Sequence, residues 1–456
     1  MTDKDGKIRI TRGIIVIILM ALVIGSIVHI QGKEKYNNLG VEECQKGNYD
    51  KAISYFNKAI ESDPNNAVVY FNRGLAYFKM GSYFNKEPFY KAIADFSKAI
   101  ELDPNYADAY YNRGLAYNNL FHHYQKLPAE SFPPEIEDKY RKAIADFDTV
   151  LELDPNYALA YAGKGNAYYR HEDSYEGMTK AIAEYDKALK FEELIIKKVG
   201  KKGLAGVYYS RGRTYTYMEE LDKAISDYLK ALELDPELMM AMGHLAAIYL
   251  DQGQYDKALE LSKKYAHLTE TKGYPLGYYA YMSRGKCYYY LKEYDKAITD
   301  FKRVIDDYDS PYEAVAYRYL GMAYSEKGDE AQAKGCFEKA IELCTQQIEK
   351  GGITIPGAYY ERGLTYMELK EYNKAISDFK KVIELKPMSD REYGHMNYYN
   401  EAHRSLGIAY LYINETQKAK ECFERAIELY KKPGGAKHKV EEVEELLKKY
   451  TKENRR

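Results

Sequence analysis

The sequence predicts an all-α protein, an α-solenoid of about ten helix–turn–helix units. Two repeated strings carry this prediction. An eight-residue frame recurs as YFNRGLAY at 70–77, YYNRGLAY at 110–117 and YYERGLTY at 359–366. Each copy precedes a second string, such as KAIADFSKAIELDP at 91–104 or KAISDYLKALELDP at 223–236. Units of this kind bury their apolar faces by stacking on their neighbours, which favours an elongated array over several globular domains.

The first string of each unit is predicted to form a helix with one buried face. Tyr110, Gly114 and Tyr117 recur with gaps of four and three, which places them on the same side of a helix. A glycine inside a helix costs about 1 kcal/mol relative to alanine. Its recurrence therefore indicates that a neighbouring helix approaches closely at this position.

The second string is predicted to form the partner helix. Ala92, Phe96 and Ala99 fall at i, i+4 and i+7, which gives a small, large, small stripe. The string often ends in Asp-Pro, as at Pro104 and Pro236. Because proline disfavours helical geometry in the residue before it and cannot donate the next backbone hydrogen bond, the chain is expected to turn there.

This pattern resembles the tetratricopeptide repeat family over nearly all of residues 33–433. The resemblance implies a right-handed solenoid that holds other proteins and catalyses no reaction. The first repeat matches the family's spacing at seven positions: Tyr36, Leu39, Gly40, Ala52, Phe56, Ala59 and Pro64. The sixth repeat departs from the family's spacing at Met242, Ala246, Ser262 and Tyr265, so the sequence does not decide whether its second helix forms.

Interruptions and a closing helix are predicted within this array. Insertions are expected near 81–90 and 118–139, and linkers near 192–204, 269–277, 345–357 and 388–399, where spacing changes or Gly and Pro gather. Residues 437–456 are predicted to be a capping helix, with Val440, Val443 and Leu447 on one face and charge elsewhere.

The amino-terminal residues predict a membrane anchor. A short cytoplasmic tail over 1–13 is followed by a transmembrane signal anchor over 14–31, where only His29 could carry a side-chain charge. The apolar run is near the lower limit of roughly 17 to 25 residues for a spanning helix, so a cleaved signal peptide is the alternative. Slightly more basic residues precede the span than follow it, which favours extracytoplasmic repeats, with a cytoplasmic array as the alternative.

Composition and residue spacing exclude several function classes. The 67 Lys and Arg residues are balanced by 69 Asp and Glu residues, so no net positive field favours nucleic acid. The five cysteines form no CxxC pair, and the adjacent His122 and His123 cannot converge on one metal ion from a helix or a strand. Candidate Ser, His and Cys nucleophiles all fall inside repeats. We expect no enzyme activity, cofactor, metal or small-molecule substrate.

The resemblance also implies where a partner would bind. In the family the first helices line a concave groove, and residues one or two places after the leading aromatic face it. An asparagine there offers both a donor and an acceptor to the backbone of an extended peptide, although it could equally be a solvated surface residue. The predicted groove residues are Asn38, Asn72, Asn112, Phe71, Tyr111, Tyr209, Arg213 and Lys286.

One sharper form of peptide recognition is not expected. The family's carboxylate clamp needs Lys and Asn, then Asn, then Lys and Arg, in three successive repeats. Those five places hold Asn37, Val41, Asn72, Asp108 and Asn112, so only Asn72 fits. The leading hypothesis is a membrane-anchored scaffold that binds an extended protein segment in its groove. The alternative is a structural or oligomerisation subunit of a cell-envelope assembly.

Overall fold

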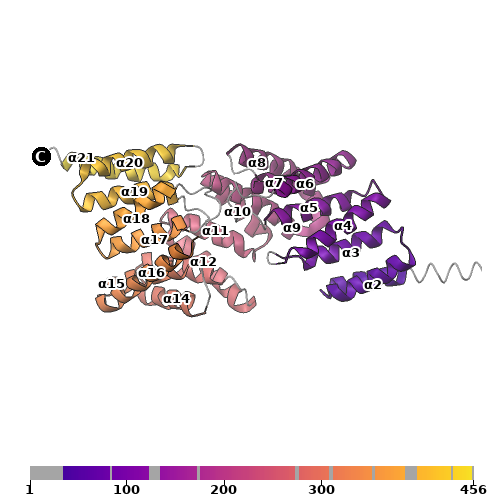
Figure 1. The fold of residues 1–456 in the computed structure, drawn as a ribbon, viewed down its shortest axis with the longest axis horizontal. Coiled ribbons are helices and arrows are strands. Elements are labelled where there is room, and N and C mark those ends of the chain that lie inside the picture. Colours follow the sequence, from indigo (N-terminus) through magenta and orange to yellow (C-terminus); the bar gives the residue numbers. More distant parts are fainter. Residues whose placement is uncertain are drawn as a thin grey trace, which may run out of the picture. The chain divides into compact units, whose positions relative to one another are not determined.

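The computed structural model describes residues 34–82, 85–122, 134–171, 175–272, 277–307, 312–351, 355–385, 398–432 and 435–453. Over these ranges the chain consists of helices and short connections, with no strand. The described residues fall into two compact units, one ending at Ala167 and one beginning at Tyr168, called here the N-terminal unit and the C-terminal unit (Figure 1). The all-α prediction is confirmed for this part of the chain.

The helices alternate regularly along the sequence. The N-terminal unit contains helical residues 34–45, α2 (Tyr49–Ser62), α3 (Ala67–Met80), α4 (Glu87–Leu102), α5 (Ala107–His122), α6 (Pro134–Leu153) and most of α7 (Ala158–His171). The C-terminal unit contains the end of α7, α8 (Tyr175–Leu189), α9 (Glu192–Tyr217), α10 (Leu221–Leu234), α11 (Met239–Asp251), α12 (Tyr255–Lys272), α13 (Tyr278–Tyr290), α14 (Tyr294–Asp307), α15 (Glu313–Glu326), α16 (Glu330–Lys350), α17 (Ile355–Glu368), α18 (Tyr372–Leu385), α19 (Tyr398–Tyr412), α20 (Thr416–Lys431), η3 (Lys437–Lys439) and α21 (Val440–Glu453).

These helices pair as the sequence predicts. Residues 34–45 and the odd-numbered helices from α3 to α19 are the first helices of the repeats, and the even-numbered helices from α2 to α20 are the second helices. The sixth repeat has its second helix, α12, despite its departures from the repeat pattern. The Asp-Pro stops hold as well, since α4 and α10 end immediately before Asp103 and Asp235.

A recurrent turn joins the first helix of a repeat to the second. In the fifth repeat Glu219 has φ 57°, and the amide of Glu220 donates to the carbonyl of Tyr215 at 2.9 Å. The amide of Gln254 donates to Tyr249 at 2.8 Å in the next repeat, where Gly253 has φ 71°. This left-handed closing turn satisfies the last helix carbonyls and reverses the chain within a few residues.

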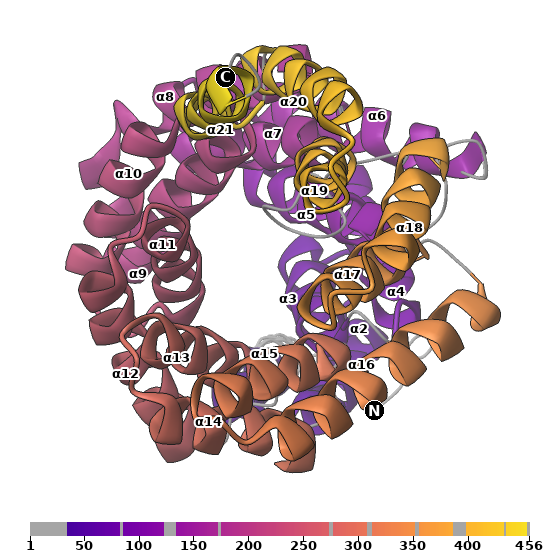
Figure 2. The same cartoon turned by 90° about the vertical axis from the view of Figure 1, so that its left-hand side faces the viewer.

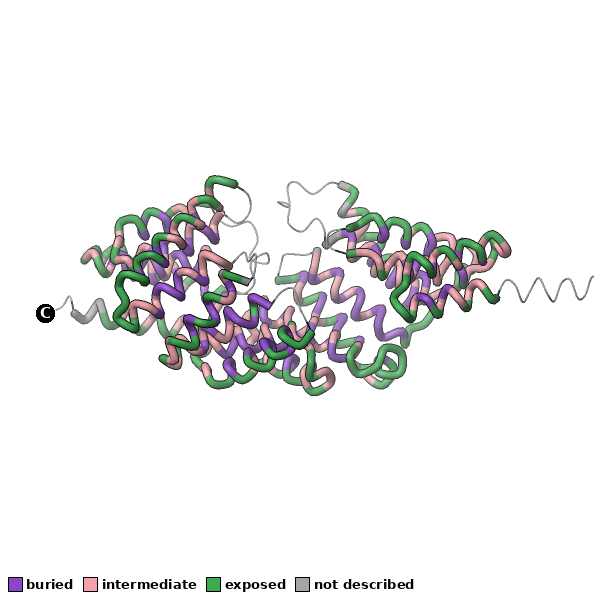
Figure 3. The backbone as a smooth tube through the Cα atoms, turned by 90° about the horizontal axis from the view of Figure 1, so that it is seen from below, coloured by how far each residue is buried: buried purple, intermediate pink, exposed green. Residues whose placement is uncertain are grey.

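Glycine and phenylalanine form the contact between paired helices. A Cβ atom at Gly74 would lie 2.7 Å from the ring of Phe96, and one at Gly363 would lie 2.6 Å from the ring of Phe379. Both rings are fully buried, and buried residues follow one side of each helix (Figure 3). The prediction of close helix approach at the repeated glycine is confirmed.

The first helices of the C-terminal unit face one another. α11 contacts α13, α13 contacts α15, α15 contacts α17, and α17 contacts α19. Figure 2 shows these helices on the inner side of a curved arrangement, with α12, α14, α16 and α18 outside them. We call the side on which the first helices contact one another the inner face. The first helices from α11 to α19 therefore lie on the inner side of this unit.

The predicted interruptions differ in outcome. The linker expected at 192–204 is helical instead, because α9 begins at Glu192 and its early part buries Ile195 completely. Only Gly200, with φ 74°, breaks this helix. The linker near 345–357 begins later than predicted, since α16 continues to Lys350. Residues 123–133 and 386–397, which hold much of the predicted 118–139 insertion and the 388–399 linker, lie outside the described residues.

The predicted capping helix is present as η3 and α21. Val443 is fully buried in the core formed by α18, α19 and α20, and Val440 and Leu447 pack against it. The predicted tail at 1–13 and anchor at 14–31 lie outside the described residues. Within the described ranges, no helix combines the length and apolar character needed to cross a bilayer.

Candidate functional site

Side chains on the inner face connect successive first helices. The guanidinium carbon of Arg213 in α9 lies 4.2 Å from the centre of the Tyr169 ring in α7. The ammonium of Lys286 in α13 lies 4.9 Å from the centre of the Tyr319 ring in α15. Both cations occupy the same register, one residue after the repeat glycine. The repeat therefore places them equivalently on the inner face.

Arg213 is held by aromatic rings rather than by a carboxylate. Its second ring neighbour is Tyr209, whose ring centre lies 5.7 Å from the guanidinium carbon. The Nε atom of Arg213 and the hydroxyl of Tyr209 are buried, and neither has a hydrogen-bond partner among the described residues. The rest of the arginine side chain is partly exposed. Cation–π contact of this kind contributes roughly 0.5–2 kcal/mol, but it supplies no acceptor.

A second arginine lies close enough to Arg213 to influence it. Burial, together with the positive charge of Arg213, lowers the pKa of Arg170 to about 10. Arg170 is the last residue but one of α7 and follows Tyr169 directly. The inner face between α7 and α9 therefore concentrates positive charge.

The inner face between α13 and α17 differs in its balance of positive and negative charge. Burial lowers the pKa of Lys286, and the negative charge of Glu361 partly offsets this effect. Arg318 donates from Nη2 and Nε to one oxygen of Glu361, at 2.9 and 3.1 Å. Arg318 and Glu361 are both buried. Here the positive charges already have a carboxylate nearby.

The predicted asparagines of the N-terminal unit lie on first helices but differ in their contacts. Asn72 donates its side-chain amide to the side-chain oxygen of Asn37, at 2.9 Å, which links two repeats. Asn112 donates to the backbone carbonyl of Asp108 in its own helix, at 2.8 Å. Asn38 is exposed. No hydrogen bond to the side-chain oxygen of Asn72 or Asn112 is seen within the described ranges.

The three predicted aromatic anchors pack largely against other rings. Phe71 lies 4.9 Å from Tyr106, and Tyr111 lies 5.2 Å from Tyr157, between ring centres. Both anchors are half-buried, whereas only 8% of Tyr209 is exposed. Phe71 and Tyr111 keep some ring surface exposed, whereas Tyr209 is buried together with its hydroxyl.

Sequence reasoning missed a set of buried ion pairs between first and second helices. In each, the arginine before the repeat glycine donates through Nε and Nη2 to both oxygens of an aspartate, at 2.6–2.9 Å. The aspartates are nearly inaccessible to solvent. The pairs are Arg73–Asp95, Arg113–Asp146, Arg211–Asp227, Arg284–Asp300 and Arg362–Asp378.

Four of these arginines also reach the preceding repeat. The Nη1 atom of Arg211 donates to Asp186 in α8 at 2.7 Å, and that of Arg73 donates to Asn57 in α2 at 2.7 Å. Arg113 and Arg362 make the corresponding bonds to Ser97 and Thr345, both at 3.0 Å. A single guanidinium thus ties one repeat to the next.

The sequence contains a signal for these pairs. Aspartate occurs three residues after the repeat alanine of the second helix wherever arginine precedes the glycine of the first helix. Where that arginine is replaced by leucine, the aspartate is absent too. These repeats carry Leu39 with Tyr55, Leu245 with Leu261, Leu320 with Cys336, and Leu406 with Cys422.

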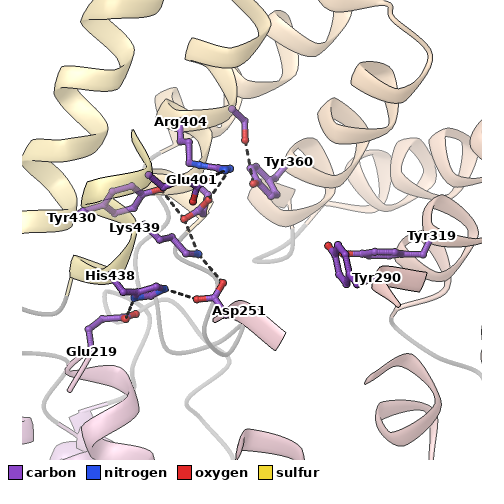
Figure 4. Close-up of polar contacts among 12 residues, drawn as sticks. Glu219, Asp251, Tyr290, Tyr319, Tyr360, Glu401, Arg404, Tyr430, His438 and Lys439 are labelled. Atoms are coloured by element: carbon purple, nitrogen blue, oxygen red, sulfur yellow. Dashed lines mark hydrogen bonds and ion pairs between the residues drawn. The ribbon is translucent and has the colours of Figure 1, made fainter. Parts of the chain in front are cut away.

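A further cluster joins the two ends of the C-terminal unit (Figure 4). His438 in η3 contacts Asp251 at the end of α11, with Nε2 and Oδ2 2.5 Å apart, and its Nδ1 lies 3.6 Å from Glu219. Lys439 lies 3.1 Å from Asp251 and 3.2 Å from Glu401 in α19. We call these five residues the terminal contact. The segment before α21 thereby returns to the turns after α9 and α11.

The two carboxylates that face His438 differ strongly in acidity. Burial raises the pKa of Glu219 to about 7, against the lowering effect of His438 and Lys439. Burial alone would raise the pKa of Asp251 as well, but hydrogen bonds from His438 and Lys439 and their positive charge lower it to about 2. Asp251 is therefore ionised at neutral pH, whereas Glu219 gains or loses its proton close to neutral pH.

Metal-binding side chains and cysteines are further candidate functional groups of the described residues. The described residues contain no cluster of His, Cys, Asp and Glu side chains that could hold a metal ion. The five cysteines are free thiols, and burial raises the pKa of Cys287, Cys344 and Cys422. Thiols of this kind are less reactive than ordinary ones.

Family models match the repeats throughout the array. A model described as TPR repeat matches residues 40–81 and 82–120, and models described as tetratricopeptide repeat match 137–193, 205–238, 227–260, 278–346, 356–389 and 400–433. The chain belongs to the tetratricopeptide repeat family. The resemblance predicted from the sequence is therefore confirmed over most of the predicted range.

Curated relatives share only part of their length with this tetratricopeptide repeat chain. BBSome complex member BBS4 of Bos taurus is 26% identical over 226 residues, which are 49% of this chain and 38% of the relative. Mitochondrial import receptor subunit TOM70 of Mus musculus is 29% identical over 170 residues, 37% of this chain and 26% of the relative. The chain thus spans well under half the length of both.

Solved tetratricopeptide repeat structures also align with it. Yeast Tom70 covers 93% of this chain and 96% of its own, at 17% identity and a TM-score of 0.40. A tetratricopeptide repeat protein of Parabacteroides merdae covers 63% of this chain and 98% of its own, at 18% identity and a TM-score of 0.42.

Proposed function

We propose that this protein is a membrane-anchored scaffold that binds an extended segment of another protein on the inner face of its first helices. The observation that carries the proposal is the set of contacts between first helices within each unit, which places polar and aromatic side chains of several repeats on the side where those helices meet. An extended peptide can meet such a row at regular intervals. No reaction is required.

The family and its members support protein binding as the general role. One relative is named as a member of the BBSome complex and another as a subunit of an import receptor. Both names describe proteins that work by associating with other proteins.

The membrane part of the proposal is supported by the apolar run at 14–31. We propose that the run stays attached as an anchor and that the repeats lie on the far side of the membrane from residues 1–13. Carbonate extraction of membranes should leave the full-length chain in the pellet. Added protease should digest the repeats only after the extracytoplasmic side has been opened, and digestion from the cytoplasmic side would contradict this orientation.

The peptide part can be tested at Asn72 and Asn112. Replacing both by alanine should weaken a bound peptide by about 1–3 kcal/mol in total, because each amide can bond to the peptide backbone. Peptides would be selected from a displayed random library with the full-length chain, and their affinities measured by fluorescence anisotropy. Asn105→Ala, at an exposed turn, is the matched control and should leave affinity unchanged.

The stability of the same variants separates binding from structure. Asn72→Ala also removes the hydrogen bond to Asn37, so we expect a modest loss of about 0.5–1.5 kcal/mol in the stability of that repeat. Failure of the full-length chain to select any peptide would contradict the proposed function. A loss of affinity that only follows the loss of stability would assign the asparagines a structural role.

A further inference from the structure

The inner face between α7 and α9 contains donors without acceptors. Arg213 lies against the rings of Tyr169 and Tyr209, and its Nε atom has no hydrogen-bond partner in the described parts of the chain. The Tyr209 hydroxyl, another buried donor, has none either. Because buried polar groups in folded proteins are nearly always hydrogen-bonded, two neighbouring exceptions need an explanation.

The electrostatic environment indicates what is missing. Arg170 and Arg213 carry like charges, and their repulsion helps to lower the pKa of Arg170. Across the described residues, no carboxylate lies within ion-pair distance of Arg213, and the groups that act on it are tyrosines. An anion on the partly exposed end of the Arg213 guanidinium would relieve this repulsion, which a neutral ligand would not do.

We propose that an acidic side chain of the bound segment docks here, with its carboxylate on the guanidinium of Arg213. This inference rests on the proposed function, because it names the chemistry of the peptide that the inner face accepts. A guanidinium binds a carboxylate through two parallel hydrogen bonds, and the partly exposed side chain leaves that contact open. The surrounding tyrosines exclude water from one side of the contact, which strengthens it.

The surroundings of the other inner-face cations do not predict a second position of the peptide at which an acidic residue would bind equally strongly. Arg318 is already paired with Glu361. Lys286 feels the negative charge of the same Glu361, although no ion pair joins them within the described ranges. The inference is therefore specific to repeats four and five, and it predicts that one acidic residue of the peptide dominates.

The test uses the full-length chain in detergent and a displayed library of random peptides. Selected peptides should contain aspartate or glutamate at one recurrent position. Each peptide would then be synthesised with glutamate or with glutamine at that position. We expect the glutamine form to bind about 10- to 100-fold more weakly to the unaltered protein.

Arg213 variants identify the site. Arg213→Gln should weaken the glutamate peptide by a similar factor and hardly change the glutamine peptide, since each change removes one half of the same contact. Arg213→Lys keeps the charge but loses the paired hydrogen bonds, so its effect should be intermediate. Arg425→Gln, an exposed arginine paired with Glu428 on α20, is the matched control and should change neither affinity.

The possible failures are distinguishable. Selected peptides without a recurrent acidic residue would overturn this inference while leaving the proposed function intact. Equal losses for both peptides in Arg213→Gln would also overturn it, because they would show a general effect on the inner face. If no peptide is selected at all, both the inference and the proposed function fail.

Discussion

Helix α9 carries two arginines, two residues apart, whose surroundings differ in kind. Arg211 faces the second helices, where it binds both oxygens of Asp227 and reaches Asp186 in α8. Arg213 faces the first helices, where it lies against tyrosine rings. The first arginine has every partner that its position requires. The second is charged and largely enclosed by aromatic side chains, and within the described residues its Nε atom has no acceptor.

The same contrast occurs between two carboxylates of the terminal contact. Asp251 is bound by His438 and Lys439, whereas one oxygen of Glu219 is buried without a hydrogen bond. Their pKa values of about 2 and about 7 follow from that difference. Asp251, with several partners, stays ionised and holds helices together. Glu219 lies 3.6 Å from His438 but accepts no hydrogen bond at that oxygen within the described residues, so it can take up a proton near neutral pH.

The largest effect should come from breaking a paired arginine. Arg211→Leu leaves Asp227 buried and uncompensated, which costs about 3–5 kcal/mol. Because a long array does not unfold in one step, the loss should be measured locally, by hydrogen exchange of the amides in α9 and α10. Amides of α18 and α19 should be unaffected.

The chain provides the compensating variant itself. The sixth repeat places Leu245 and Leu261 where the fifth has Arg211 and Asp227. The double variant Arg211→Leu with Asp227→Leu should therefore recover most of the lost stability, since a well-packed apolar pair can replace a buried ion pair. A double variant as unstable as the single one would show that the contact to Asp186, rather than the buried carboxylate, decides the stability.

The next effect concerns Glu219 and depends on pH. Its pKa is raised from 4.5 to about 7, so the folded state binds its proton more tightly than the unfolded state. The associated stability is fully present below pH 4.5 and is lost as the pH rises through 7. Glu219→Gln should therefore stabilise the terminal contact at pH 8 by about 1–3 kcal/mol and change little at pH 4.5. Hydrogen exchange of the amides in η3 and α21, measured at both pH values, would show this change in stability.

The contribution of Asp251 to stability should depend on pH in the opposite direction. Its pKa is lowered from 3.8 to about 2, so its contribution is present above pH 3.8 and is lost as the pH falls through 2. Asp251→Asn should loosen η3 and α21 at pH 7 by about 1–2 kcal/mol. Glu444→Gln, which removes an exposed pair with Lys431, is the control. Equal hydrogen-exchange protection of η3 and α21 in Asp251→Asn and Glu444→Gln would show that the terminal contact contributes little to stability.

The repeat fold could be predicted from the sequence because each repeat contains both residues that form the contact between its two helices. Gly74 and Phe96 meet as their spacing predicts, and the same spacing recurs along the chain. The prediction of a linker at 192–204 rests on its glycines, and Gly200 does interrupt α9, but the residues on both sides of it are helical and Ile195 is fully buried. Local composition does not show whether a neighbouring helix will cover such a segment.

The sequence predicted which helices carry Arg213 and Lys286, but not which groups surround them. It could not show that Arg211 pairs with two carboxylates while Arg213 pairs with none among the described residues, because the partners of Arg211 come from α8 and α10. The terminal contact joins His438 to Asp251, 187 positions away in the sequence, and no repeat rule relates them.

The smallest expected effect on stability is the most informative about function. Arg213→Gln removes an unpaired charge and leaves the rings of Tyr169 and Tyr209 in place, so hydrogen-exchange protection in α9 should change by about 0–1 kcal/mol, in either direction. Arg211→Gln is the matched variant on the same helix and should cost several times more, because it disrupts two ion pairs. Losses of equal size would mean that Arg213 is structural after all. Unequal losses, together with the loss of acidic peptide binding only in Arg213→Gln, would separate the face of α9 that holds the array together from the face that holds its ligand.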